Sequence, residues 1–280
     1  MRRSLTALAP QLITLAALVA LVSVFFPGFV EIRLIDGRMV GPIIDILKRG
    51  APVALLAIGM TLVIATRGID LSVGTVMAIC GAVAAWSIDK GLGLGGAVAL
   101  AIAAGLVAGL WNGTLVAIIG IQPIVATLIL MTAGRGIAQL ITEGRILTFT
   151  HDGFSWFGSG TFLTVPVPAV IWVVTGITVA LLMRRTALGL LVESIGINRR
   201  ASALAGINAT VLLIAVYMAS GLCAALAGII TAADIRGADA NNAGLWLELD
   251  AILAVVIGGN SLLGGRFSVA ASLLGAMIIQ

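Results

Sequence analysis

The stretch GLGLGGAVALAIAAGLVAGLWNGTLVAIIGIQPIVATLILMTAG, residues 91–134, decides the fold because it carries no charged side chain over 44 positions. An apolar helix of about 20 residues, rising about 1.5 Å per residue, crosses a hydrocarbon core of about 30 Å. The stretch is therefore long enough for two such helices. Lipid is the solvent that the sequence predicts for this part of the chain.

Three further uncharged runs lie at residues 4–30, 153–183 and 201–233. Charged residues form only 10% of the sequence, against roughly 25% in soluble domains. The 35 glycines agree with a membrane bundle, because small residues let helices approach closely in lipid. We therefore predict an all-α, polytopic transmembrane helical bundle.

About nine apolar helices are expected, divided at glycine, proline and charged residues. The ninth has only about 14 residues before Gln280, so it looks cut short relative to the about 17–25 residues that a span needs. The expected helices lie at about 8–26, 43–65, 71–88, 92–118, 122–142, 165–183, 208–232 and 248–262, and from near 267.

Arg2 and Arg3 precede the first apolar run, which is longer than the about 7–15 apolar residues of a cleaved signal. We expect a retained span with both arginines in the cytoplasm. After six crossings, the loop 184–208 also faces the cytoplasm, and its four arginines agree with the positive-inside tendency. Basic residues at several other turns face outward in this layout, so the agreement is partial.

Several functional classes are excluded by composition and spacing. The net charge is only +4 and the basic residues are scattered, so no nucleic-acid partner is expected. The single histidine, His151, and the distant Cys80 and Cys223 give no metal-ligand spacing. Residues 91–96 match G-x-G-x-x-G without the strand that a dinucleotide site needs, and residues 259–266 lack the Lys-Ser/Thr of a P-loop. We predict that this chain binds no nucleotide and no cofactor.

The segment RGIDLSVG, residues 67–74, interrupts an apolar stretch from about 51 to 88. A charge at the bilayer centre costs about 2.5–3.5 kcal/mol on insertion scales, so Arg67 and Asp70 must face protein, water or the interface. The count of crossings favours a cytoplasmic turn in which Asp70 or Ser72 caps the next helix. A broken helix beside a substrate path is the other interpretation.

Gly105, Gly109 and Gly113 form two linked G-x-x-x-G steps on one helix face. Such a face permits close backbone packing, and packing within the chain is favoured over a dimer interface. Asn112 lies beside this face, where it can bond to another helix or line a path.

The segment 184–208 is too polar to span a membrane, but it has enough apolar residues to form short helices. It suits docking to a soluble partner, or it is a simple interfacial helix. The loop 143–165 holds five aromatic residues, which favours a position along the outer interface.

Two of these segments resemble a known family. IGMTLVIATRGIDLSVG, residues 58–74, resembles the signature of ABC-importer permeases for ribose-type monosaccharides, with Arg67 where the family usually has a glycine. SIGINRRASALAGIN, residues 194–208, resembles that family's coupling loop, with Arg199-Arg200 in place of a commoner Glu-Ala. The similarity is strongest to permeases of the galactofuranose type, through GIQPIVATLILMTAGRG, TAADIRGADANNAGLWLELDA and VIGGNSLLGGRFS.

The resemblance implies that residues 1–280 form a single permease domain of the bacterial inner membrane, C-terminally incomplete relative to the family. It implies a periplasmic sugar-binding protein, a second permease subunit that is identical or related, and a cytoplasmic ABC ATPase. ATP and magnesium would lie on that ATPase, so the chain is expected to be a transport subunit and not an enzyme. Within 184–208, the expected coupling residues are Glu193, Gly196, Asn198, Arg199, Arg200, Ala201, Gly206, Ile207 and Asn208.

A sugar path needs hydrogen-bonding side chains and stacking faces. The candidates are Asp70, Ser72, Asn112, Gln122, Asn241, Asn242, Trp246 and Glu248. An ordinary outer loop is the alternative for residues 239–246. An ion-coupled secondary transporter, for which Asp70 and Arg135 are the nearest ionisable candidates, and a non-transporting scaffold also stay open.

Overall fold

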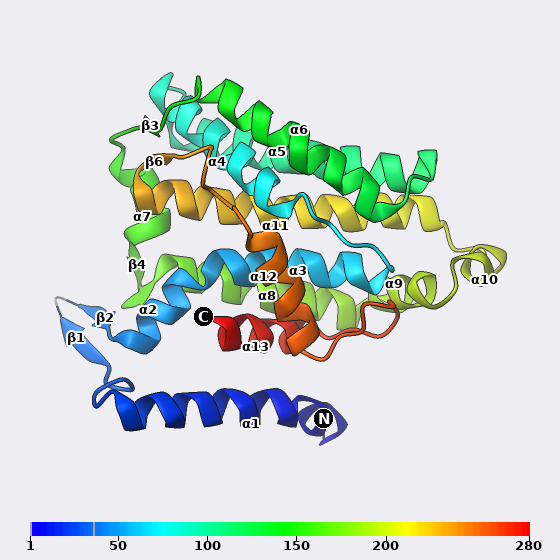
Figure 1. The fold of residues 1–280 in the computed structure, drawn as a ribbon, viewed down its shortest axis with the longest axis horizontal. Helices are drawn as coiled ribbons and strands as arrows, with labels where there is room; N and C mark the ends of the chain where they lie inside the picture. Colours follow the sequence, from blue (N-terminus) through cyan, green and yellow to red (C-terminus); the bar gives the residue numbers. More distant parts are fainter. Residues whose placement is uncertain (1, 36) are drawn as a thin grey trace.

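The apolar runs form a bundle of helices, most of which lie along one common direction (Figure 1). The computed structural model of the protein describes residues 2–35 and 37–280, with side chains from Leu8 onward. In the first half of the chain the elements are α1 (Arg2–Phe25), β1 (Arg33–Ile35), β2 (Arg38–Val40), α2 (Pro42–Arg49), α3 (Ala51–Ala65), α4 (Val73–Asp89), α5 (Gly93–Thr114), the π-helical turn η1 (Leu115–Ile119) and α6 (Pro123–Ile141). The elements that follow are β3 (Leu147–Thr148), α7 (Asp152–Ser159), β4 (Thr161–Phe162), β5 (Val165–Pro166), α8 (Val167–Arg185), α9 (Ala187–Ile197), α10 (Arg199–Leu204), α11 (Ala209–Ile235), β6 (Gly237–Ala238), α12 (Leu247–Ile257) and α13 (Val269–Ile279).

The expected all-α membrane bundle is confirmed, and an apolar helix occupies each of the nine expected places. Among the described residues, five helices are long and apolar enough to cross a membrane, or six if α2 and α3 are one bent span. Helices α4 and α13 are also apolar but shorter, at 17 and 11 residues. Helix α12 has only 11 residues and ends at Ile257 instead of near 262, because Gly258 and the left-handed Gly259 turn the chain.

The bend between α2 and α3 has a local cause. The two helices meet at Gly50 with an angle of 46°. Pro52 lies in the first turn of α3, has no N–H to donate to the turn before it, and its ring crowds that turn. The expected single helix over 43–65 is therefore broken near its start.

Helix α11 is the centre of the bundle and packs against α3, α4 and α5. Its contact with α5 is made by backbone, because a Cβ atom on Gly105 would collide with the carbonyl oxygen of Gly221. A Cβ on Gly109 would lie 2.7 Å from the Cα of Met218, and one on Gly113 would lie 2.8 Å from the Cα of Ile214. The predicted small-residue face of α5 thus packs inside this chain, and α11 is its partner.

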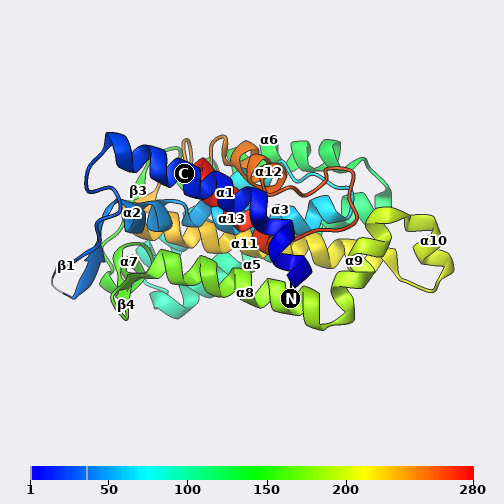
Figure 2. The same ribbon diagram turned by 90° about the horizontal axis from the view of Figure 1, so that it is seen from below.

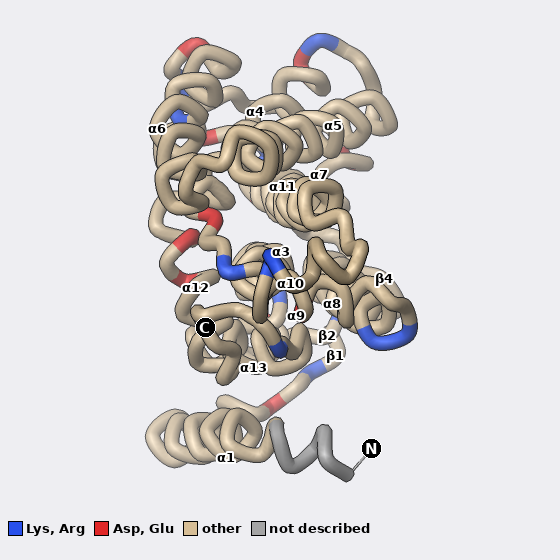
Figure 3. The backbone as a smooth tube through the Cα atoms, turned by 90° about the vertical axis from the view of Figure 1, so that its right-hand side faces the viewer, with Lys and Arg blue, Asp and Glu red and all other residues tan. Residues whose placement is uncertain are grey.

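Helix α1 lies on the outside of the bundle, over α13 (Figure 2). Figure 3 views the molecule from the side on which α9 and α10 lie, and most of the backbone there belongs to uncharged residues. The one long-range bond of α1 that the structure shows for side chains from Leu8 onward runs from Gln11 Nε2 to the carbonyl oxygen of Gly258, at 2.8 Å.

Short strands tie the loops at the end of the bundle opposite α10. Strand β3 pairs antiparallel with β6, β1 pairs with β2, and β4 pairs with β5. The loop 143–165 has a buried part and an exposed part. Phe149 and Phe154 are buried with their ring centroids 5.2 Å apart, whereas Trp156 and Phe162 are exposed. The expectation that the whole loop lies along the outer interface is therefore wrong for its buried half, because α7 packs onto α11.

We predict that Gly105→Val lowers the thermal stability of the detergent-solubilised protein by about 1–3 kcal/mol, because overpacking separates α5 from α11. The measurement is the apparent Tm in a thermal unfolding experiment on the purified protein. Gly136→Val in α6 is the control, because a Cβ at Gly136 meets nothing within 4 Å. Equal Tm values for the two variants would contradict the backbone contact.

Candidate functional site

A buried polar cluster lies where α3 ends and α4 begins. Asp70 is only 3% exposed. Its Oδ1 accepts hydrogen bonds from Ser72 Oγ at 2.6 Å and from the Ser72 N–H at 3.1 Å, and its Oδ2 accepts one from Ser220 Oγ at 2.9 Å. Asn112 Nδ2 completes the cluster by donating to Ser72 Oγ at 2.8 Å. The cluster therefore joins the start of α4 to α5 and α11.

Asp70 does not lie at an exposed turn, because its side chain is buried inside the bundle; that the turn faces the cytoplasm stays a prediction. Figure 1 shows the chain turning back toward the bundle from the end of α3 before α4 begins. Thr127 of α6 holds this turn, since its hydroxyl donates to the Ile69 carbonyl and accepts from the Leu71 N–H, both at 3.2 Å. The Ser72 side chain does not cap α4. The chain is non-helical or turned between α3 and α4, as a broken helix requires, and a position beside a substrate path stays a prediction.

The predicted coupling segment folds as two short helices, α9 and α10, at one end of the bundle (Figure 1). Asn198 Oδ1 caps α10 by accepting from the Ala201 N–H at 3.0 Å, and Asn208 Oδ1 caps α11 by accepting from the Val211 N–H at 3.1 Å. Capping side chains satisfy backbone donors that a helix start leaves free. The structure thus gives both asparagines a structural role in shaping this loop.

The tip of this segment is apolar and basic. Leu204 is 92% exposed, and Ala201 and Arg200 are exposed beside it. Arg199 is different, because its Nη2 donates to the Ala117 carbonyl oxygen at 3.2 Å. Gly206, with a φ of 85°, forms the turn between α10 and α11.

A cleft of about 260 Å³ opens between this segment and the bundle. Its lining includes Arg67, Gln122, Arg199 and Tyr217. The Tyr217 hydroxyl is buried and has no hydrogen-bond partner among the described residues. Of the predicted path residues, only Gln122 lines this cleft.

The segment 239–246 is a turn that is fixed against the bundle. A Cβ on Gly244 would collide with the backbone of Gly74, so the segment lies against the first turn of α4. Arg135 of α6 holds it in place, because its Nη1 donates to the carbonyl oxygens of Ala240 at 2.9 Å and Ala243 at 2.7 Å. The positioning role of Arg135 was missed from the sequence, although a lone arginine at the end of a 44-residue uncharged run is a signal for it.

The polar side chains of this segment stay exposed. Asn241 and Asn242 are exposed, and Trp246 is 63% exposed with a φ of 67°. Asn241 Oδ1 accepts from Gln139 of α6 at 2.7 Å. Asn242 Nδ2 donates to Asp239 at 2.8 Å, which lowers the pKa of that carboxyl from its ordinary value. Asn241, Asn242 and Trp246 are together called the exposed polar strip, which contacts α6 through Asn241.

The structure therefore divides the predicted path residues among four places. Asp70, Ser72 and Asn112 form the buried cluster, Gln122 lines the cleft, and Asn241, Asn242 and Trp246 lie on the exposed strip. Glu248 is buried in the first turn of α12, near Gly74. A single cavity that holds all of them is absent among the described pockets.

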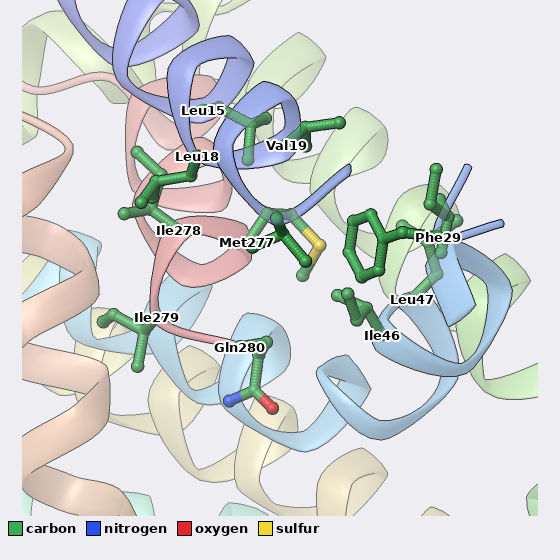
Figure 4. A pocket seen from close by; sticks show the side chains of 12 residues that line it. Leu15, Leu18, Val19, Phe29, Ile46, Leu47, Met277, Ile278, Ile279 and Gln280 are labelled. Atoms are coloured by element: carbon green, nitrogen blue, oxygen red, sulfur yellow. The ribbon is translucent and has the colours of Figure 1, made fainter. Parts of the chain in front are cut away.

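The largest of the described pockets has the wrong chemistry for a sugar. A groove of about 460 Å³ lies between α1, α2 and α13 (Figure 4). Apart from Gln280, the side chains that line it are apolar. It offers few of the hydrogen-bonding groups that fix the orientation of a polar ligand.

Comparisons with known proteins agree with this architecture. Residues 42–280 match the protein family described as "Branched-chain amino acid transport system / permease component". The chain is 60% identical to the galactofuranose transporter permease protein YtfT of Escherichia coli, over 97% of this chain and 80% of that protein. It is 45% identical to the fructose import permease protein FruF of Bifidobacterium longum, over 87% and 69% of the two chains. It is 40% identical to the ribose import permease protein RbsC of Escherichia coli, over 96% and 82%. No solved structure matches the chain.

The protein is thus a membrane-embedded permease, built from apolar helices with a short polar segment at one end. The chain belongs to the family of ABC-transporter permease components that these matches define. It is a multi-pass transport subunit of the bacterial inner membrane. The resemblance drawn from residues 58–74 and 194–208 is confirmed.

We predict that Asp70→Asn destabilises the protein by about 1–3 kcal/mol, because one of the buried donors loses its carboxylate acceptor. The apparent Tm of the purified protein measures this change. Asp89→Asn is the control, because that carboxylate is exposed at the end of α4. An unchanged Tm for Asp70→Asn would show that the cluster does not hold α4, α5 and α11 together.

Proposed function

We propose that this chain is the permease subunit of an ATP-driven importer for a monosaccharide of the galactofuranose type. A periplasmic sugar-binding protein delivers the sugar, and a second permease, identical or related, completes the path. A cytoplasmic ABC ATPase holds ATP and magnesium and acts on the segment 184–208. The identities of 60%, 45% and 40% to three permeases named for sugars support this substrate class.

The observation that carries the proposal is the exposed polar strip beside α6. Amide side chains are costly in lipid unless they face water, protein or a bound ligand. Asn241 and Asn242 are exposed by the last turns of α6, and Trp246, which follows them in the sequence, has a ring that offers a stacking face. A water-filled sugar path shared with a second permease satisfies these groups.

Gln122 and the cleft of about 260 Å³ extend this assignment to the other end of the bundle. Arg199 and Gln122 line this cleft and offer hydrogen bonds suited to sugar hydroxyls. We assign this cleft to the cytoplasmic exit of the path.

The coupling assignment is supported by the shape of α9 and α10. A small exposed apolar patch around Leu204, flanked by Arg200, suits insertion into a groove of a soluble partner. Gly196 seats α9 on the bundle, because a Cβ there would collide with the Ala65 carbonyl oxygen. A push on the tip is therefore passed to the helices behind it.

Ion-coupled transport is the second candidate, favoured by the buried carboxylate of Asp70 alone. The two mechanisms separate in vesicles that contain the full importer. Uptake that needs ATP and survives collapse of the ion gradients supports the proposal. Uptake that persists without ATP while a gradient is kept assigns the chain to the other class.

We predict that Asn242→Ala lowers sugar uptake about tenfold or more without lowering the amount of protein in the membrane. The magnitude follows from about 1.4 kcal/mol per tenfold change, which is within the range of a lost polar contact to the sugar. Uptake of radiolabelled sugar and an immunoblot measure the two quantities. Thr132→Ala is the control, because Thr132 is exposed on α6 and its hydroxyl bonds only to its own helix. A normal uptake rate for Asn242→Ala would reject the strip as the path.

We also predict that Gly206→Val abolishes the stimulation of ATP hydrolysis by sugar-loaded binding protein and leaves membrane insertion intact. The left-handed φ of Gly206 strains any β-branched residue, so the turn before α11 must change. Gly144→Val is the matched control, because Gly144 also has a left-handed φ, of 72°. At both glycines a Cβ meets nothing within 4 Å. Full stimulation in Gly206→Val would remove the coupling role from this turn.

A further inference from the structure

Arg67 joins three segments that are far apart in the sequence. Its Nε donates to the carbonyl oxygen of Leu263, and its Nη2 donates to the carbonyl oxygen of Ile197, both at 2.8 Å. Leu263 lies in the turn between α12 and α13, and Ile197 is the last residue of α9. One side chain therefore holds the end of α3 against that turn and against the segment 184–208.

The chemistry of these bonds favours arginine in particular. The last carbonyl groups of a helix have no partner within the helix and carry a partial negative charge. The planar guanidinium of Arg67 donates to two acceptors at once, which the compact ammonium of a lysine does less well. Arg67 forms no ion pair with any described carboxylate, so the two carbonyl groups are its assigned partners.

The backbone around these bonds is tightly interlocked. The Gly265 N–H donates to the Ala65 carbonyl oxygen at 2.9 Å. A Cβ on Gly196 would lie 2.6 Å from the Gly265 nitrogen, and a Cβ on Gly264 would collide with Arg67 Cγ. Because close-packed groups leave little free space, α9 cannot shift here without displacing its neighbours.

The chain from Arg67 to Asp70 connects these contacts to the buried polar cluster. Arg67 has a φ of 64°, a strained conformation that persists where the surroundings fix it. A Cβ on the next residue, Gly68, would lie 2.7 Å from the Tyr217 hydroxyl oxygen, and Asp70 bonds to Ser220 in the same helix. Residues 67–70 therefore connect α9 to the middle of α11 through four consecutive positions.

We propose that Arg67 is a positioning residue that couples the segment 184–208 to the break between α3 and α4. A displacement of α9 pulls on Arg67 and moves the Asp70 cluster, which changes the packing of α4 against α5 and α11. This inference rests on the proposed ATP-driven import, since it assigns a mechanical link within that cycle.

The test uses the complete importer, with its ATPase and binding protein, reconstituted in liposomes. Arg67→Met keeps the apolar stem and removes both donors. Arg67→Lys keeps the charge but not the planar guanidinium that donates to two acceptors. We expect Arg67→Met to lower sugar uptake per ATP hydrolysed by about fivefold or more, the lower end of a typical coupling between sites. Arg67→Lys is expected to give an intermediate ratio, and Arg236→Met an unchanged one. Arg236 is the control because it is exposed, has a φ of 53° and lies at the end of α11 away from α9.

The ratio of uptake to hydrolysis separates coupling from folding, because a variant that only folds poorly loses both activities in proportion. If Arg67→Met inserts too poorly to assay, the same ratio measured for Arg67→Lys decides. A wild-type ratio in the variants overturns the inference and leaves the proposed import standing. Absence of ATP-dependent uptake by the wild-type importer overturns the proposed function itself.

Discussion

The packing of α11 against its neighbours is the constraint on which the rest of the structure depends. At Gly105 and Gly221, and again at Gly81 and Gly228, two helices approach so closely that backbone touches backbone. In lipid no hydrophobic effect drives helices together, so this close contact supplies dispersion energy that larger side chains would prevent. The position of α11 then fixes Tyr217 and Ser220, and through them the chain that connects α3 to α4.

A second feature follows from that arrangement: single polar side chains connect segments that are far apart in the sequence. Asp70 connects α4, α5 and α11, Arg135 connects α6 to the segment 239–246, and Arg67 connects α3 to α9. Each of these side chains connects a helix to a non-helical segment or to a helix end, where the backbone has free donors or acceptors. Transport needs two arrangements of the bundle, and we expect contacts of this kind to pass small shifts from one element to another.

Much of the fold was predictable from the sequence, because an uncharged run long enough to cross lipid has few alternatives to a helix. The small-residue face of α5 and the short helices within 184–208 were also predicted correctly. The partner of that face, α11, was not predictable, since spacing along one helix does not say which other helix meets it. The short length of α12 escaped prediction for a local reason, because two glycines end it inside a run that is still apolar.

The candidate site was harder to predict because its residues depend on the tertiary arrangement. Asp70 and Asn112 were singled out as polar residues in apolar surroundings, but their bonds to Ser220 and Ser72 cross between helices. Arg67 was placed at a turn, and nothing in its neighbourhood in the sequence points to Ile197 or Leu263. Periodicity and composition report on single elements, and contacts between elements need the folded chain.

We propose that the segment 184–208 faces the cytoplasm, where a separate ATPase can act on it. Labelling of Arg200→Cys with a membrane-impermeant maleimide in intact cells tests this claim directly, because the native Cys80 and Cys223 are buried and give little background. We expect labelling of Arg200→Cys only after the inner membrane is permeabilised, and labelling of Arg236→Cys without that step. Labelling of Arg200→Cys before permeabilisation would contradict the orientation and the energy source together.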